Sequence, residues 1–256
     1  MPSLRQLLRL PYIARQPGGL GAIRRWKPFS VTAFEMARAL QAQGFAFGTI
    51  IDGGANVGQF ARAMTETFPG ATLHCFEASP SVADTLATNL ADRPQVHVHR
   101  TALGRTGGTL TFHQHAYSLA SSALPDHPNR AASFPEADRV TTIDVPMQAL
   151  EAILAPSDLA PPTLLKLDLQ GYEIEALHGA DALLPHIDYV LLETAFKPMY
   201  QGEPLFDEVY AFMQMRGFRF LRPLDVLRDA TGELVQMDAL FTRADARTEA
   251  SASAPG

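Results

Sequence analysis

The segment from Thr49 to Glu77 constrains the fold more than any other part of this chain of 256 residues. Residues 49–51 are apolar or β-branched, which is typical of a buried parallel strand, and the sequence Asp-Gly-Gly-Ala-Asn-Val-Gly follows. Apolar residues then recur at helical spacing over residues 57–68, and residues 72–76 predict a second strand that ends at Glu77. The segment therefore predicts strand, glycine turn, helix, strand and acid, an order close to the dinucleotide-binding fingerprint.

This order predicts a cofactor site at the carboxyl ends of the strands, where open α/β sheets bind their ligands. Glycines let backbone N–H groups approach a ligand closely, and an acid at the position of Glu77 suits the two hydroxyls of a ribose. Asp52, directly before the first glycine, would repel a pyrophosphate but suits a cationic amino group. We therefore favour S-adenosylmethionine over a nicotinamide dinucleotide. A carboxylate that only caps the helix is the ordinary alternative.

Charge and composition limit the compartment and the partners. The chain is 46% hydrophobic and 19% charged, which is usual for a soluble enzyme. Residues 1–30 hold six Lys and Arg and no acid, so the other 226 residues carry 15 bases against 27 acids. An acidic body argues against nucleic acid as the main partner, because phosphate binding needs a basic surface. The single cysteine, Cys75, allows no internal disulfide and fits the cytoplasm.

The pattern along the chain predicts three regions. Residues 1–30 should form a basic extension that is poorly ordered or packed on the domain, with a weak membrane-surface contact as the alternative. No apolar run approaches 18 residues, so no membrane-spanning helix is expected. Residues 31–243 should form the main domain, in which residues 104–146 predict a β-excursion and a candidate lid. The small, polar residues 244–256 predict a disordered tail.

The expected fold class is α/β, with a Rossmann-like, doubly wound, mostly parallel sheet and an antiparallel C-terminal edge. Besides the two strands above, apolar runs predict parallel strands at 96–101, 163–169 and 189–192, and an antiparallel pair at 218–221 and 239–242. Residues 117–139 read as a loop and 140–145 as a strand. Helices are expected at 31–43, 79–90, 147–154, 172–184 and 206–215.

A second motif, in residues 164–173, repeats the design of the first. An apolar strand delivers Asp168 to its carboxyl end, just before Gly171 and a predicted helix. Lys166 and Asp168 are two residues apart and therefore lie on the same side of the strand. Charged side chains in an apolar strand are costly unless they are paired or used. A catalytic acid and a structural ion pair that orders the loop both explain this pattern.

With both motifs, the sequence resembles the FkbM family of class I S-adenosylmethionine-dependent methyltransferases over about residues 44–243. The resemblance rests on residues 51–58, 76–80, 102–104, 121–122, 166–173, 179–180, 192–193 and 238–241. Three positions depart from the usual family pattern, since Gly53 replaces Val, Ala78 replaces Pro and Gln170 replaces Glu. The last change removes a carboxylate near the expected reaction centre.

The resemblance implies a class I methyltransferase fold over residues 31–243, with S-adenosylmethionine as the cofactor. Its methionine part would be held by Asp52, Gly53, Ala55, Asn56 and Gly58, with Gly54 in the same turn. Its ribose would be held by Glu77, and its adenine by Ala78, Ser79, Thr101 and Ala102. Family members mostly O-methylate hydroxyls of sugars, glycans or natural products, so the acceptor would be a small molecule or a glycan.

For the reaction, we expect Asp168 to act as the base or to orient the acceptor hydroxyl, supported by Lys166, Glu173 and Glu193. Three side chains are expected to contact the acceptor: Ser121, Ser122 and Tyr200. The carboxylates Asp168, Glu173 and Glu193 would suit Mg²⁺ if they converged, but their convergence does not follow from the sequence and no metal site is predicted. An NAD(P)-dependent oxidoreductase or epimerase and a non-catalytic binding subunit are the alternative functions.

Overall fold

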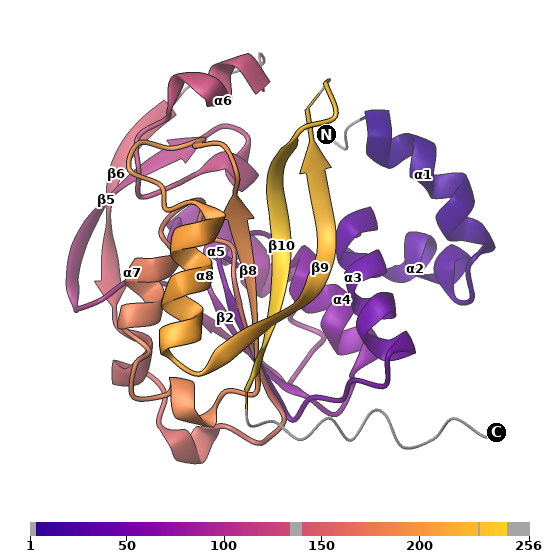
Figure 1. Ribbon diagram of the computed structural model, residues 1–256. Coiled ribbons are helices and arrows are strands. Elements are labelled where there is room, and N and C mark those ends of the chain that lie inside the picture. Colours follow the sequence, from indigo (N-terminus) through magenta and orange to yellow (C-terminus); the bar gives the residue numbers. More distant parts are fainter. Residues whose placement is uncertain (1–3, 134–139, 230, 245–256) are drawn as a thin grey trace.

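A seven-stranded sheet forms the centre of the computed structural model, which describes residues 4–133, 140–229 and 231–244 (Figure 1). The strand order is β3-β2-β1-β7-β8-β10-β9. The first five strands in this order are parallel to one another, whereas β10 is antiparallel to both β8 and β9. The predicted mostly parallel, Rossmann-like sheet with an antiparallel C-terminal edge is confirmed. The strands are β1 Thr49–Gly53, β2 Thr72–Phe76, β3 Val96–His99, β7 Thr163–Leu167, β8 Tyr189–Ala195, β9 Phe218–Arg228 and β10 Leu234–Arg243.

Both faces of this sheet are apolar, because helices cover both. Consecutive residues of the central strands alternate between two core clusters, as Ile50 and Ile51 of β1 and Leu191 and Leu192 of β8 do. One cluster packs against α3 Val31–Ala42, α4 Gln59–Thr67 and α5 Pro80–Asn89. The other packs against α7 Glu173–His178 and α8 Phe206–Met215 (Figure 1). Asp52, two residues after Ile50, therefore points to the side of α3 and α4.

The excursion between β3 and β7 forms a second sheet of three strands in the order β4-β6-β5. Its strands are β4 Ala102–Leu103, β5 Gly108–His115 and β6 Val140–Gln148, and β5 and β6 pair along their whole length. Between them the chain forms a 3-10 turn, η1 Ser118–Ala120, and a short helix, α6 Pro128–Ser133. The expected loop at 117–139 is thus partly helical where it is described, and residues 134–139 lie outside the described residues.

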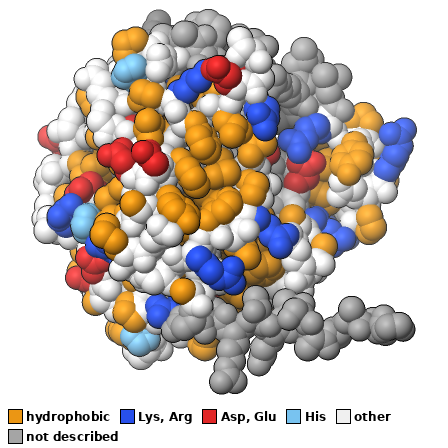
Figure 2. All heavy atoms as spheres, viewed as in Figure 1, with side chains coloured by type: hydrophobic (Ala, Val, Ile, Leu, Met, Phe, Trp, Pro, Cys, Tyr) orange, Lys and Arg blue, Asp and Glu red, His pale blue; other side chains and the backbone are white. Residues whose placement is uncertain are grey.

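The N-terminal residues pack on the domain. Helices α1 Leu4–Arg15 and α2 Gly19–Arg25 contact α3 through a small apolar cluster that includes Ile13, Ala22 and Phe34. Arg9 also pairs with Glu35 of α3. No helix in the described part of the chain is long and apolar enough to cross a membrane. On the face of Figure 2, hydrophobic side chains gather near the middle, with Lys and Arg side chains around them. The predicted tail lies outside the described residues, except for Ala244.

Two predicted helices are wrong in extent. Residues 147–148 extend β6, because they pair with β4, and only the 3-10 turn η2 Leu150–Ala152 follows. The helix expected at 172–184 ends at His178. A Cβ on the next residue, Gly179, would lie 2.0 Å from the carbonyl oxygen of Gly104, so the chain approaches another segment closely there. The remaining 3-10 turns are η3 Pro156–Asp158 and η4 Leu184–His186. The strands β9 and β10 are longer than predicted, at 11 and 10 residues.

Candidate active site

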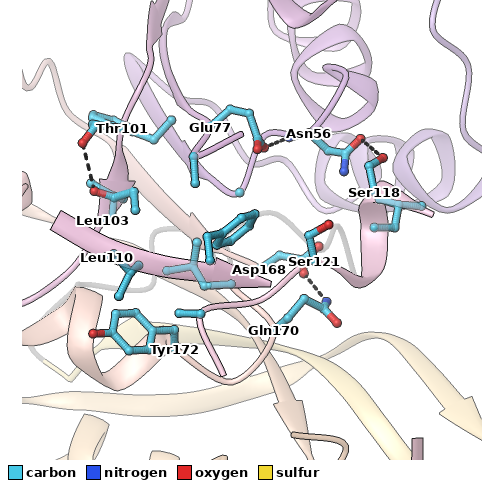
Figure 3. Close-up of a pocket in the computed structure, with 18 residues that line it drawn as sticks. Asn56, Glu77, Thr101, Leu103, Leu110, Ser118, Ser121, Asp168, Gln170 and Tyr172 are labelled. Atoms are coloured by element: carbon cyan, nitrogen blue, oxygen red, sulfur yellow. Dashed lines mark hydrogen bonds between the residues drawn. The ribbon is translucent and has the colours of Figure 1, made fainter. Parts of the chain in front are cut away.

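A first cavity opens at the carboxyl ends of β1 and β2, beneath the second sheet (Figure 3). The glycine turn after β1, the end of β2 and the loop after β7 form its polar wall. Apolar side chains of β4, β5 and η1 form the other wall. Its lining residues include Gly54, Asn56, Phe76, Glu77, Ala78, Thr101, Ala102, Leu103, Leu110, Phe112, Ser118, Leu119, Ser121, Asp168, Gln170 and Tyr172. An elongated ligand with one apolar ring and several polar groups fits such a lining.

Glu77 lines this cavity, and backbone hydrogen bonds orient its carboxylate. Its carboxylate accepts a backbone hydrogen bond of 2.9 Å from the N–H of Asn56 (Figure 3) and another of 2.9 Å from the N–H of Ser79. Burial raises the pKa of Glu77, and these two N–H groups act in the opposite direction. Each carboxylate oxygen has a further lone pair, so Glu77 can accept hydrogen bonds from two hydroxyls of a ligand.

The glycine turn is pressed against the end of β7, and this contact requires Gly54. Its φ is +73°, a left-handed conformation that favours glycine, and a Cβ here would lie 2.0 Å from the carbonyl oxygen of Asp168. The N–H groups of Gly54 and Ala55 donate to the carbonyl of Phe76, so they hold β1 to β2. Asn56 also has a positive φ, of 48°, and its side chain accepts a hydrogen bond of 3.0 Å from Ser118 of η1.

Asp52 and Lys166 form a buried ion pair beneath this turn. They lie opposite each other on β1 and β7, with 3.0 Å between Lys166 Nζ and an Asp52 oxygen. The ammonium also reaches the carbonyls of Gly53 and Gly54, and it lies 3.6 Å from Asp168. Burial lowers the pKa of Lys166, but the charges of Asp52 and Asp168 outweigh it, so the pKa ends above its ordinary value. Asp52 is fully buried and lines neither cavity, and its partner in this structure is Lys166, so its contact with the amino group of the cofactor stays a prediction.

Gln170 is the centre of the hydrogen bonds around Asp168. Its side-chain amide donates to Asp168 at 2.7 Å and also to Glu193, and its amide oxygen lies 2.7 Å from the hydroxyl of Tyr200. A glutamate at this position has no N–H to donate. The departure from the family pattern therefore adds a donor that orients two carboxylates at once. Sequence reasoning assigned Gln170 no role.

The structure separates the predicted residues into three groups. The first cavity is lined by Gly54, Asn56, Glu77, Ala78, Thr101, Ala102, Ser121 and Asp168. A second cavity is lined by Ala55, Lys166 and Glu193, and again by Gly54, Asn56 and Asp168. Asp52, Gly53, Gly58, Ser79, Ser122, Glu173 and Tyr200 line neither cavity.

Three of these residues support loops instead of facing a ligand. Ser122 is fully buried, and its hydroxyl donates a hydrogen bond of 2.7 Å to the backbone carbonyl of Gln170. Tyr200 is buried between Gln170 and the carbonyl of Ala120. Glu173 is 4% exposed and accepts the N–H of Leu169 at 2.7 Å, which closes the turn after β7. In this structure the three side chains hold the loops around the site, and the acceptor contacts of Ser122 and Tyr200 and the catalytic support from Glu173 stay predictions.

Glu173 should make the folded protein less stable as the pH rises. Burial raises the pKa of Glu173 to about 8, whereas an unfolded chain releases this proton near pH 4. The folded state thus holds the extra proton between these values, and stability falls across that range as the pH rises. Between pH 6 and pH 8 the unfolding free energy of the wild type should decrease. In Glu173→Gln we expect this decrease to be smaller by about 1–2 kcal/mol. Urea unfolding at both pH values measures it.

The matched control is Glu175→Gln, an exposed position on the same helix that pairs with Arg105. It should leave the pH dependence as in the wild type. If the unfolding free energies of wild type and Glu173→Gln depend equally on pH, Glu173 is ionised in the folded protein at neutral pH.

The second cavity has a volume of about 330 Å³ and adjoins the first, sharing Gly54, Asn56, Leu119, Asp168 and Gln170. It lies on the α3 and α4 side of the sheet. Its polar lining from the C-terminal strands consists of Glu193, Asp225, Gln236 and Asp238. Burial, then the charges of Asp168 and Asp225, raise the pKa of Asp238 to about 8. Burial, then the charges of Asp168 and Asp238, raise the pKa of Glu193 well above its ordinary value.

Sequence reasoning missed Asp225, Gln236 and Asp238. The predicted last strand began at residue 239, whereas β10 begins five residues earlier, at Leu234. The sequence does contain a signal for the longer strand, because the polar residues Gln236 and Asp238 stand at alternate positions directly before the apolar run 239–242. Polar residues at alternate positions indicate one strand face that meets a polar environment.

Comparisons with known proteins agree with this geometry. A family model described as the methyltransferase FkbM domain matches residues 52–220. Methyltransferase 1 of Beauveria bassiana is 27% identical over 144 residues, which are 52% of this chain and 58% of that protein. The 2-O-methyltransferase NoeI of Sinorhizobium fredii is 23% identical over 161 residues, 60% of this chain and 66% of that protein. Each alignment leaves about a third or more of the relative uncovered.

Among solved structures, the methyltransferase FkbM from Methylobacillus flagellatus aligns with a TM-score of 0.51 at 12% identity. The alignment covers 93% of this chain and 59% of that one. This likeness shows the common class I methyltransferase fold. The family match spans more than half of the chain, from the glycine turn through the loop after β7 and into β9. The chain is a member of the FkbM methyltransferase family.

Proposed function

We propose that this protein is an S-adenosylmethionine-dependent methyltransferase that O-methylates a hydroxyl of a sugar, a glycan or a related metabolite. One observation carries the proposal: two adjoining cavities share the loop that holds Asp168. A transferase needs two such sites, because the group that leaves one ligand must reach the other directly. The name of the Sinorhizobium relative, a 2-O-methyltransferase, supports oxygen as the acceptor atom. A cytoplasmic location is part of the proposal, supported by the buried thiol of Cys75.

The first cavity fits S-adenosylmethionine. Glu77 would accept both ribose hydroxyls, since its carboxylate is already fixed by two N–H groups. The apolar wall, with Ala102, Leu103 and Leu110, suits the adenine ring. Gly54 and Asn56 would border the methionine part where the two cavities meet. When bound, the cofactor supplies a methyl group already activated on a sulfonium.

The chain's own task is then to position the acceptor hydroxyl, take up its proton and exclude water. Asp168 lies where the cavities meet, and its side chain is 31% exposed. One of its oxygens accepts the N–H of Gln170, and the other lies 3.6 Å from Lys166. Both contacts fix the carboxylate's orientation, and its remaining lone pairs can accept the proton of an acceptor hydroxyl.

Calorimetric titration with S-adenosylhomocysteine tests the function, with NAD and NADP measured in parallel. We expect S-adenosylhomocysteine to bind and Glu77→Ala to weaken it at least about ten-fold, because a charged acceptor for two hydroxyls is lost. The control is Glu175→Ala, an exposed position outside both cavities, which should bind as the wild type does. Binding of NAD or NADP instead would establish an oxidoreductase. Binding of none of the three would establish a non-catalytic subunit.

A further inference from the structure

The second cavity contains a row of carboxylates across four neighbouring strands. Asp238 of β10 stands directly opposite Glu193 of β8 and, on its other side, opposite Asp225 of β9. Asp168, just after β7, continues the row, because the Gln170 amide donates to both Asp168 and Glu193. Opposite residues on neighbouring strands have Cβ atoms about 5 Å apart, and like charges there destabilise the sheet. A row of this kind needs compensation by positive charge.

The protein supplies that compensation at one end only. Among the described residues that line this cavity, Lys166 is the single Lys or Arg, and it already contacts Asp52, two carbonyls and Asp168. At the other end, neither Asp225 nor Asp238 forms an ion pair with a cation of the lining, and the charge of Lys166 only partly offsets the effect of burial on Asp238. Burial and the neighbouring charges leave the pKa of Asp238 at about 8, so this carboxyl holds a proton at neutral pH when nothing compensates it.

A second observation indicates that a ligand belongs in this cavity. Gln236 is only 9% exposed and lines the cavity, yet its side chain has no hydrogen-bond partner among the described residues. It lies two residues before Asp238, on the same side of β10. Its amide is open to the cavity, and a ligand that covers it has to supply a hydrogen bond, because a polar group buried without one costs about 1–3 kcal/mol. Gln236 and Asp238 are therefore placed to receive the same ligand.

The chemistry of that ligand follows from the two walls of the cavity. One wall is the carboxylate row, and the other places Met36 and Phe60 of α3 and α4 beside the polar side chains of Ser30, Thr32 and Gln59. The carboxylates extend along the row, and among the described residues no three His, Cys, Asp or Glu side chains are arranged to hold a metal ion. An ammonium has three donors and no acceptor and suits such a row, whereas an anionic group would add negative charge to it.

We propose that the acceptor is a hydroxylated ring that carries an ammonium group, such as an amino sugar or an aminocyclitol. Glu193, Asp225 and Asp238 would hold the ammonium, Gln236 would bind a neighbouring hydroxyl, and Asp168 would face the hydroxyl to be methylated. This inference rests on the proposed function, since it names the acceptor class of the same site.

The test measures binding to protein saturated with S-adenosylhomocysteine, by calorimetry at pH 6.5, where the amines carry their protons. The probes are glucose, its 2-amino, 3-amino and 6-amino derivatives, N-acetylglucosamine and glucuronate. We expect at least one amino derivative to bind about ten-fold or more tightly than glucose and N-acetylglucosamine, and glucuronate to bind weakest. Equal binding of amino and neutral sugars, preference for glucuronate, or no binding by any probe would overturn the inference.

The variant Asp225→Asn tests whether the negative charge of this carboxylate causes the preference for an amino derivative. This change is isosteric and keeps the oxygen that accepts the N–H of Val226 at 2.9 Å, so the local fold should persist. It should reduce the preference for the amino derivative to within about three-fold of glucose, with S-adenosylhomocysteine binding unchanged. Asp84→Asn, an exposed position that pairs with Arg100, is the control and should keep the preference. If the wild type fails to bind S-adenosylhomocysteine, the proposed function itself is wrong.

Discussion

Lys166→Met should destabilise the protein by about 3–5 kcal/mol, because it leaves the fully buried Asp52 without its cation. Met has a similar length, so the loss comes from charge and hydrogen bonds more than from packing. The carbonyls of Gly53 and Gly54 lose a donor as well, which should loosen the turn that borders both cavities. We expect weaker binding of S-adenosylhomocysteine in the same variant. Urea unfolding and calorimetry measure the two effects.

Two further variants separate charge from packing. Adding Asp52→Asn to Lys166→Met removes the uncompensated carboxylate and should recover more than half of the lost stability. Lys197→Met, in which an ammonium bound to Asp229 and Glu233 on a more exposed part of the chain is lost, should cost no more than about 1 kcal/mol. Similar losses for Lys166→Met and Lys197→Met would contradict the importance of the buried pair.

Asp168→Asn should slow methyl transfer by about 100- to 10,000-fold, since the variant keeps the shape of the side chain but cannot take up a proton. Its amide oxygen can still accept the N–H of Gln170, so the loop after β7 should persist. We therefore expect S-adenosylhomocysteine affinity within about three-fold of the wild type. The initial rate of S-adenosylhomocysteine release with an amino sugar acceptor measures the effect.

The pH profile distinguishes a base from a residue that only orients the acceptor. If the pH–rate profiles of the wild type and of Asp168→Asn differ in shape, Asp168 acts as a base, and if they differ only in height, it orients the acceptor. An undiminished rate in Asp168→Asn with bound cofactor would rule out Asp168 as the base. In that case Glu193, which shares the Gln170 amide, becomes the next residue to test.

Strands and helices with strong local signals were predicted from the sequence, and those that depend on distant contacts were not. The strand at 72–76 and the helix at 206–215 have the predicted bounds, because an apolar pattern ends at a turn or a glycine in each case. The helix expected at 172–184 stops early where Gly179 meets the backbone of Gly104, about 75 residues away. The helix expected at 147–154 lost its first turn to strand pairing with β4. Neither contact can be predicted from the sequence close to the residues that make it.

The candidate site divides in the same way. Glu77, Asp168 and Gly54 follow from the rule that ligands meet the carboxyl ends of parallel strands, and all three line the first cavity. Asp225 and Asp238 join the site through the register of β10 between β8 and β9. A shift of one residue would turn their side chains to the other face. The supporting role of Tyr200 likewise depends on its tertiary contact with Gln170.

The position of the carboxylate row within the sheet has a consequence for how such an enzyme diversifies. Met237 and Ala239, the neighbours of Asp238 along the chain, are buried in the core opposite the row, as is Leu192 beside Glu193. New surface loops can be inserted without disturbing a core, but residues on the strands of a sheet cannot be moved independently of it. With the acceptor bound by this row as we propose, a substitution on β8, β9 or β10 that changes the acceptor preference should also change the stability of the fold.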